Sequence, residues 1–315
     1  MVPAQCYLGT VIALLAPGQG SQSPGMLSPW LELPGAPARI EQWSAAAGLD
    51  LERLGTTAEA EEITDTAVTQ PLVVALALLA YEELDRRGQV RAGTLTAGHS
   101  VGELAAAAIA GVFSADDAVA LAAVRGAAMG EACAAEQTGM SAVLGGDAEE
   151  VLTRLQELEL TPANRNAAGQ IVAAGRLGAL ADLEKDPPAK ARVRALSVAG
   201  AFHTSFMASA QDAVAARAAT ITPEDPIRPL LSNADGARLD SGAEVLRRLV
   251  TQVTNPVRWD LCMASMAAAQ VSALVELPPA GALVGMAKRE LRGTPTVALK
   301  TPEDLAALAE LELGR

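Results

Sequence analysis

A short apolar segment that runs into a glycine-flanked serine, and then into a helix, most constrains the fold of this chain. Residues 94–99 predict a buried strand, the sequence GHSVG follows at 98–102, and residues 101–110 predict a helix. Glycines on both sides of Ser100 are typical of a turn with little room for side chains. In an α/β fold, this G-x-S-x-G pattern exposes the serine hydroxyl at the helix N-terminus as a nucleophile. An ordinary turn with Ser100 as the helix N-cap is the alternative.

The order of the other elements also predicts an α/β fold. An apolar run at 11–16 ends at a Pro-Gly pair and indicates a buried strand. Residues 70–87 predict a helix with Pro71 in its first turn. Ser114 predicts the N-cap of another helix, with Asp117 three residues later as in a capping box. Strands and helices that alternate in this way predict a mostly parallel sheet covered on both faces.

The middle of the chain predicts a smaller unit. Its strands and helices follow the order βαββαβ, which is typical of a ferredoxin-like fold. The expected elements are a strand at 140–144, a helix at 148–158, strands at 161–166 and 170–174, a helix at 177–184 and a strand at 193–198. We expect this unit to be an insert in the larger domain. That domain then continues with strands near Leu230 and Leu274, a helix at 281–291 and a last helix from Pro302.

Charge and composition exclude several classes of partner and site. The 315 residues include 24 Lys and Arg against 37 Asp and Glu, which gives a net charge of -13. Binding to nucleic acid or to anionic lipid needs basic residues, so we expect neither nucleic acid nor a membrane as partner. The cysteines have neither disulfide nor zinc-site spacing, and we expect small buried side chains and no metal site. They are Cys6, Cys133 and Cys262.

Nothing in the sequence predicts targeting or a membrane span, so we expect a cytoplasmic protein. The apolar run at 11–16 is far too short to cross a bilayer, and the run at 72–81 leads directly into acidic residues. Residues 1–10 carry no positive charge and do not resemble a signal peptide.

A serine nucleophile needs a base, and the chain contains two histidines, His99 and His203. Successive side chains diverge at such a turn, so we expect His99 to be structural. His203 remains as the candidate base, and a serine with a base from a distant segment is the geometry of acyl transfer. A core histidine with satisfied hydrogen bonds is the alternative for His203.

Arg125 lies on the apolar stripe of the helix that Ser114 caps, beside residues such as Leu121 and Met129. An unpaired buried charge is very costly, so this arginine must meet an anion. The planar guanidinium suits a ligand carboxylate. An Asp or Glu elsewhere in the chain is the alternative partner.

The loop PGQGSQ at 17–22 follows the first predicted strand. It lacks the third glycine of a dinucleotide-binding motif and the lysine of a phosphate-binding P-loop. Its tight backbone could bring the N–H of Gln19 to an oxyanion, together with the N–H of Val101 at the start of the helix.

Taken together, these motifs resemble those of malonyl-CoA:acyl carrier protein transacylases of bacterial fatty-acid synthesis. They are similar, more loosely, to acyltransferase domains of polyketide synthases. The resemblance covers nearly the whole chain, through PGQGSQ at 17–22, TQP at 69–71, GHSVGE at 98–103, RG at 125–126, NRNAAGQIVAAG at 164–175, GAFHT at 200–204 and QVTNPVRW at 252–259. Residues 1–10 precede the usual start of these sequences.

The resemblance implies an α/β-hydrolase-like large domain at 1–136 and 200–315, with a ferredoxin-like small subdomain inserted at 137–199. It implies Arg125 as the group that binds the malonyl carboxylate, with Gln70 as a polar support. Phe202 is typical of members selective for malonyl, and its bulk would crowd a methyl group on the malonyl α-carbon.

The resemblance also implies the catalytic roles. Ser100 would be the nucleophile and His203 its general base. The backbone carbonyl of Gln252 would hold the Nδ1–H of this histidine, and the N–H groups of Gln19 and Val101 would form the oxyanion hole.

The implied reaction is ping-pong transfer of malonyl from malonyl-CoA to the phosphopantetheine thiol of acyl carrier protein, through a malonyl ester of Ser100. It needs no cofactor and no metal, and relatives of this kind are commonly monomers. A hydrolase, which uses the same serine and histidine, is one alternative. A module that binds the carrier with an inactive site is the other.

Both implied partners, CoA and an acidic carrier protein, are anionic like the chain itself, so the net field opposes their approach. Positive charge must then be concentrated at the mouth of the cleft. Lys288, Arg289 and Arg292 form the first candidate patch, and Arg192 and Arg194 on the predicted insert form the second. A solvated helix face is the alternative reading of the first patch.

Overall fold

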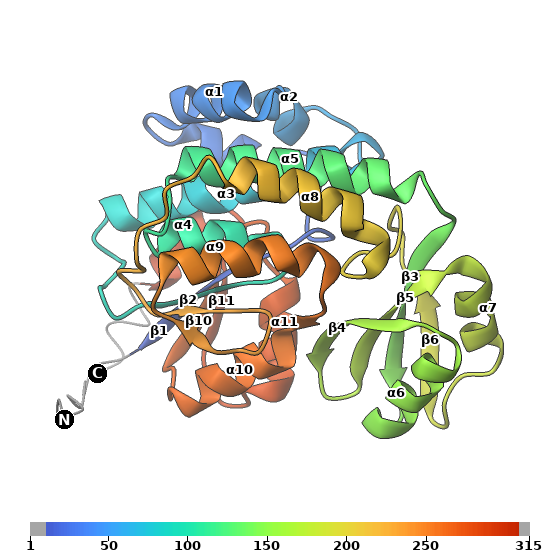
Figure 1. Ribbon diagram of the computed structural model, residues 1–315. Coiled ribbons are helices and arrows are strands. Elements are labelled where there is room, and N and C mark those ends of the chain that lie inside the picture. Colours follow the sequence, from blue (N-terminus) through green and yellow to red (C-terminus); the bar gives the residue numbers. More distant parts are fainter. Residues whose placement is uncertain (1–10, 309–315) are drawn as a thin grey trace.

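Two β-sheets organise the computed structural model, which describes residues 11–308 (Figure 1). The larger sheet has six strands in the order β11-β10-β1-β2-β7-β8, and all its pairs are parallel except β7 with β8. Its strands are β1 (Ile12–Ala16), β2 (Leu95–Gly98), β7 (Leu230–Leu231), β8 (Arg238–Leu239), β10 (Ala273–Glu276) and β11 (Thr296–Ala298). The mostly parallel α/β architecture expected from the sequence is confirmed.

Helices cover both faces of this sheet (Figure 1). Successive side chains of a strand point to opposite faces. In β1, Leu14 and Ala16 pack into the core beneath α3, α4 and α5, whereas Ala13 and Leu15 pack against α10 and α11. The larger domain contains α1 (Ala36–Ala47), α2 (Leu51–Thr56), α3 (Thr66–Arg86), α4 (Gly102–Ile109), α5 (Ala115–Cys133), α8 (Ala208–Ala218), α9 (Gly242–Thr251), α10 (Trp259–Ala268) and α11 (Ala282–Glu290).

The smaller sheet has the ferredoxin-like order. Its first four strands lie as β6-β3-β5-β4, and every pair among them is antiparallel. Two helices pack on it through a separate apolar cluster (Figure 1). The elements are β3 (Thr138–Gly145), α6 (Ala148–Glu157), β4 (Thr161–Ala167), β5 (Gln170–Arg176), α7 (Leu177–Lys185) and β6 (Ala191–Ala195). A fifth strand, β9 (Val257–Arg258), comes from a distant part of the chain and pairs with β4. The smaller sheet is therefore held to the rest of the fold by this pairing as well as by the segments that connect them.

The helix predicted from residue 70 begins earlier than the sequence indicated. α3 starts at Thr66, because the Asp65 carboxylate caps it by accepting the N–H of Ala67 at 2.8 Å. Pro71 therefore lies inside the helix, where its missing N–H removes one helical hydrogen bond. Gln70 is buried in this helix and accepts a hydrogen bond from Arg125 of α5.

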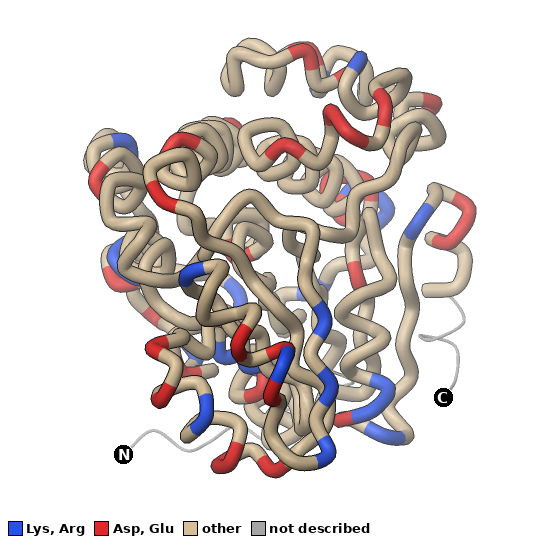
Figure 2. The backbone as a smooth tube through the Cα atoms, turned by 90° about the vertical axis from the view of Figure 1, so that its right-hand side faces the viewer, with Lys and Arg blue, Asp and Glu red and all other residues tan. Residues whose placement is uncertain are grey.

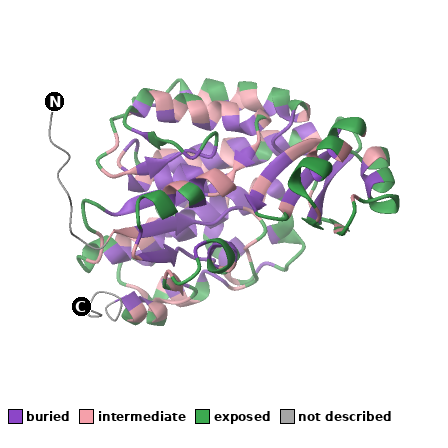
Figure 3. Cartoon of the chain, turned by 90° about the horizontal axis from the view of Figure 1, so that it is seen from below, coloured by how far each residue is buried: buried purple, intermediate pink, exposed green. Residues whose placement is uncertain are grey.

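By length and composition α3 could also cross a membrane, but 78% of its most apolar window is buried inside the fold. Figure 3 shows the same burial across the centre of the molecule, with exposed positions on the outer helices. Of the cysteines, Cys262 is buried, Cys133 is partly buried and both are free thiols. Cys6 lies outside the described residues.

Candidate active site

The GHSVG segment forms a tight turn between β2 and α4. Ser100 has a φ of 54°, a left-handed conformation that costs energy for a residue with a side chain. A Cβ on Gly98 would lie 2.1 Å from the backbone of Gly102, and one on Gly102 would lie 2.3 Å from the carbonyl of Ala16. Only glycine fits either position, which explains the glycines on both sides of the serine.

Asn233, which follows β7, braces this turn. Its Oδ1 accepts the N–H of Ser100 at 2.8 Å, and its Nδ2 donates to the carbonyl of Gly98 at 2.7 Å. Asn233 is fully buried. Its two hydrogen bonds hold the serine in its left-handed conformation. The role of Asn233 cannot be predicted from the sequence, because nothing in the local pattern places this residue beside a turn more than 130 positions earlier.

Ser100 and His203 contact each other directly. The serine Oγ lies 2.8 Å from the histidine Nε2, and the histidine Nδ1 lies 2.9 Å from the backbone carbonyl of Gln252. Because a carbonyl only accepts, Nδ1 carries the proton and Nε2 is left to accept the serine hydroxyl hydrogen. Burial, helped by the nearby charge of Arg125, lowers the pKa of His203 to about 3. The imidazole is therefore a neutral base at physiological pH.

His99 points elsewhere. Its Nε2 lies 2.9 Å from Oδ1 of Asn166, and its ring meets Trp259 edge to face with centroids 5.6 Å apart. The hydrogen bond to Asn166 links the GHSVG turn to β4 of the smaller sheet, and burial lowers the pKa of His99.

Arg125 lies beside the serine and is 2% exposed. Its Nη1 donates to Oε1 of Gln70 at 2.6 Å, and its Nη2 donates to Oε1 of Gln252 at 3.0 Å and to Ser100 Oγ at 3.3 Å. Burial lowers the pKa of Arg125 to about 10, so it stays charged near pH 7. No ion pair with an Asp or Glu is found for it within residues 11–308. The buried guanidinium thus donates directly to two neutral amide oxygens. The acidic residue that interacts with its charge is Glu103, which is linked to it through Gln252 and forms no direct ion pair with it.

The loop at 17–22 packs against the GHSVG turn. A Cβ on Gly18 would lie 2.6 Å from the carbonyl oxygen of His99, so the approach of the two backbones is close. The side chain of Gln19 donates to Thr66 Oγ1 at 3.2 Å, which ties the loop to the start of α3. Among the described residues, neither the N–H of Gln19 nor that of Val101 donates a hydrogen bond. Two free backbone donors therefore lie on the segments that flank Ser100.

The remaining candidates are Phe202 and the basic residues at and after the end of α11. Phe202 is buried next to His203 in the main core cluster. Lys288, Arg289 and Arg292 are exposed at and beyond the end of α11. Arg289 donates to Oε1 of Gln170 on β5 at 2.7 Å, so this patch extends to the smaller sheet. Figure 2 shows the basic positions as short segments interspersed with acidic ones.

Within residues 11–308, no three His, Cys, Asp or Glu side chains are grouped so that they could hold a metal ion. A half-buried serine in contact with a buried histidine, a neighbouring arginine and two free backbone N–H groups define a site suited to acyl transfer. The model of the acyl transferase domain family matches residues 14–304, and the chain belongs to this family.

Within that family the chain is similar to malonyl CoA-acyl carrier protein transacylases. The protein of that name from Mycobacterium tuberculosis (strain ATCC 25618 / H37Rv) is 67% identical over 303 residues, which are 96% of this chain and 100% of the relative. The one from Escherichia coli (strain K12) is 34% identical over 309 residues, with coverage of 96% and 100%.

Solved structures agree with this placement. The crystal structure of the Mycobacterium tuberculosis protein, described as MCAT, has a TM-score of 0.93 at 66% identity and covers 95% of this chain and 99% of that one. A structure described as a type II PKS acyl-carrier protein in complex with its malonyl-transacylase has a TM-score of 0.90 at 29% identity, with coverage of 96% and 99%.

Proposed function

We propose that this protein transfers malonyl from malonyl-CoA to the phosphopantetheine thiol of acyl carrier protein. The observation that carries this proposal is the buried guanidinium of Arg125, which forms no direct ion pair among the described residues and whose Nη2 lies 3.3 Å from Ser100 Oγ. A fixed positive charge beside the nucleophile suits an acyl group that ends in a carboxylate. The names of the relatives support the same substrate and acceptor.

The reaction has two halves with the same groups. Ser100 Oγ attacks the thioester carbonyl while His203 Nε2 takes its proton. The tetrahedral oxyanion accepts hydrogen bonds from the N–H groups of Gln19 and Val101. Collapse of this intermediate expels CoA, whose thiolate takes the proton from His203. In the second half the thiol of the carrier gives its proton to His203 and attacks the malonyl ester. Collapse then frees Ser100, which regains that proton.

Arg125 binds the malonyl carboxylate in both halves, and Gln70 holds the guanidinium from the other side through the 2.6 Å hydrogen bond. Every step uses protein groups alone, so we propose that no cofactor or metal takes part. We further propose that the protein is a cytoplasmic monomer, with the large domain at 1–136 and 200–315 and the small subdomain at 137–199. Which carrier protein accepts the malonyl group determines whether the protein serves fatty-acid or polyketide synthesis.

The direct test uses malonyl-CoA and two forms of carrier protein, one with phosphopantetheine and one without. We expect mass spectrometry to find malonyl on the first form only, since the second lacks the accepting thiol. If malonyl-CoA is not consumed in the presence of the carrier protein that bears phosphopantetheine, the proposal is wrong.

Phe202 is proposed to limit the acyl group to malonyl. A methyl group on the malonyl α-carbon would meet its ring, and we expect discrimination of roughly 1–3 kcal/mol, as for other single-methylene differences. Replacing Phe202 by Ser should lower the ratio of the malonyl loading rate to the methylmalonyl loading rate. An unchanged ratio would remove Phe202 from the list of specificity residues.

Reversal of Lys288 and Arg289 to Glu is expected to raise the KM for carrier protein and to leave self-malonylation from malonyl-CoA unchanged. The reason is that the two exposed side chains would supply local positive charge on a chain whose net charge is -13. Steady-state kinetics at two salt concentrations measure the effect, which should shrink at high salt.

Lys185 and Lys300 provide a charge-matched control for this reversal. Both side chains are exposed, neither has an ion pair among the described residues, and their change to Glu alters the net charge equally. If both double variants raise the KM for carrier protein to the same extent, only net charge matters and the proposed patch at Lys288 and Arg289 is wrong.

A further inference from the structure

A buried carboxylate lies behind Ser100 and has no part in the reaction described above. Glu103 belongs to the first turn of α4 and is 4% exposed. Its Oε1 accepts the backbone N–H of Asn233 at 2.8 Å, and its Oε2 accepts the side-chain Nε2 of Gln252. Glu103 thus contacts two residues that themselves contact the catalytic groups.

Gln252 links Glu103 to the arginine. Its side-chain Nε2 donates to Glu103, and also to the carbonyl of Ser100 at 3.1 Å. Its Oε1, at the other end of the amide, accepts Nη2 of Arg125 at 3.0 Å. A primary amide donates through nitrogen and accepts through oxygen, so the two ends are not interchangeable. If the amide were reversed, its NH₂ group would face the N–H donors of Arg125 and that hydrogen bond would be lost.

We propose that Glu103 is a positioning residue for malonyl loading: its carboxylate fixes the direction of the Gln252 amide, and the amide oxygen holds Arg125 beside Ser100. A carboxylate can only accept hydrogen bonds, so it selects the amide orientation in which Nε2 faces it. The inference rests on the proposed function, because it assumes that Arg125 binds the malonyl carboxylate.

The surroundings of Glu103 decide when it is ionised. Burial raises its pKa to about 7, against the hydrogen bonds from Asn233, Gln252 and Ser232 and the positive charge of Arg125. The Cys262 thiol of α10, whose pKa is raised by burial, also interacts with it.

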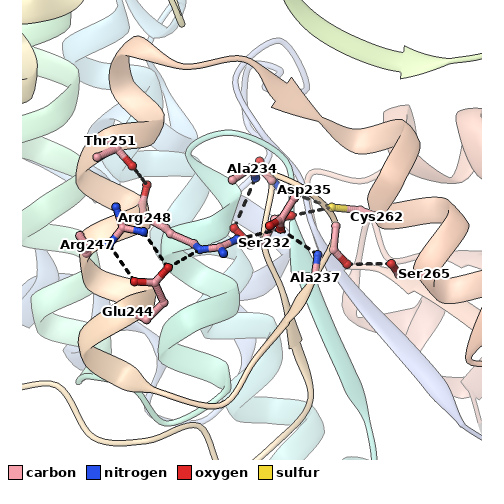
Figure 4. A network of polar contacts seen from close by, with 12 residues as sticks. Ser232, Ala234, Asp235, Ala237, Glu244, Arg247, Arg248, Thr251, Cys262 and Ser265 are labelled. Atoms are coloured by element: carbon pink, nitrogen blue, oxygen red, sulfur yellow. Dashed lines mark hydrogen bonds and ion pairs between the residues drawn. The ribbon is translucent and has the colours of Figure 1, made fainter.

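Glu103 and Gln252 also line a cavity of about 580 Å³. A polar cavity of this size holds water, so the carboxyl group can exchange protons with solvent. In Figure 4, Arg247 and Arg248 lie with their partners Glu244 and Asp235. The remaining charged residues of the cavity wall are Arg165 and Arg258.

Protonation of Glu103 places a donor where Gln252 Nε2 now donates, which favours the reversed amide. Malonyl loading should therefore fall as the pH drops through about 7. Acetyl loading, which does not use the charge of Arg125, serves as the reference at each pH. His203 does not titrate in this range, because its pKa is about 3.

The test measures single-turnover acylation by malonyl-CoA and by acetyl-CoA, for wild type and for Glu103→Gln, on both sides of pH 7. For wild type we expect the malonyl-to-acetyl ratio to decrease below pH 7. For Glu103→Gln we expect a ratio about 10- to 100-fold lower than wild type above pH 7, and independent of pH, because one charged hydrogen bond is misdirected. The melting temperature of each protein shows that it is folded.

Glu276→Gln is the matched control. Glu276 is also a fully buried glutamate, and it accepts the N–H groups of Gly281, Leu283 and Val284 at the start of α11. It has no hydrogen bond to Gln252 or Arg125, and we expect its malonyl-to-acetyl ratio to match wild type.

A purely structural Glu103 would lower both rates equally and leave the ratio unchanged, which would overturn the inference. So would a wild-type ratio that is constant through pH 7. Failure of the proposed function is distinguishable, since wild type would then form no malonyl-enzyme at any pH.

Discussion

Replacing Ser100 by alanine is expected to abolish the malonyl-enzyme and to lower transfer to carrier protein by roughly 10⁴- to 10⁶-fold, the range seen when a serine nucleophile is removed. The reason is covalent: without the Oγ that lies 2.8 Å from His203 Nε2, no ester can form and the ping-pong route is closed. Binding of carrier protein should be unchanged, since it does not depend on the hydroxyl. A carrier-binding module with no catalytic role would show no change in transfer.

Intact-protein mass spectrometry after incubation with malonyl-CoA measures the first effect directly. Ser44→Ala is the control, because Ser44 lies on α1, where its hydroxyl accepts the N–H of Leu51 at 3.1 Å, and that helix carries none of the site residues. The control should form the malonyl-enzyme as wild type does. Malonyl retained on the Ser100→Ala chain would place the nucleophile elsewhere.

Replacing Arg125 by alanine is expected to remove the preference for malonyl over acetyl. Truncating one partner of a buried, hydrogen-bonded charge pair costs about 2–5 kcal/mol, which is a factor of at least about 30. The malonyl carboxylate would lose its guanidinium, whereas an acetyl group has no carboxylate to lose. Ser100 and His203 keep their mutual hydrogen bond, so acyl-enzyme chemistry should continue with acetyl-CoA.

Single-turnover loading of the two acyl-CoAs measures this preference. Arg125→Lys keeps the charge but not the planar fork that reaches both Gln70 and Gln252, so we expect an intermediate ratio. Equal losses of malonyl and acetyl loading in Arg125→Ala would show that the arginine serves the chemistry in general and does not recognise the carboxylate.

The alternation of apolar runs was sufficient to predict the fold class. Buried parallel strands such as β1 read as continuous apolar segments, and the βαββαβ order of the insert implies the β6-β3-β5-β4 sheet that the structure has. Boundaries were harder. β6 lies at 191–195 and not at 193–198. It is an edge strand in which only Ala191 and Val193 are half-buried against the small apolar cluster, so its apolar signal is weak.

Elements set by tertiary contacts escaped the sequence analysis. A strand near Leu230 was predicted and is β7, but β8 and β9 were not, because two residues are too few to form a pattern of their own. In α3, Pro71 suggested a first turn, but the helix is capped by the carboxylate of Asp65 and starts four residues earlier than predicted.

Some residues of the candidate site could be predicted from the sequence, and others are recognised only in the folded structure. Ser100, His203 and Arg125 could be proposed from a local motif, from the presence of one other histidine and from a charge on an apolar stripe. Glu103 could not, because an acidic residue in the first turn of a helix is ordinarily explained by the helix dipole. Its burial and its contact with Gln252 exist only once α4 and the segment after α9 are packed together.

The most direct test of the whole account is incubation of the wild-type protein with malonyl-CoA in the absence of any thiol acceptor, followed in time by intact-protein mass spectrometry and assay of free malonate. The account predicts one malonyl group per chain on Ser100, stable until phosphopantetheinylated carrier protein is added and then transferred to it. Rapid and continuous release of free malonate, with no accumulated malonyl-enzyme, would contradict it and would identify the protein as a hydrolase.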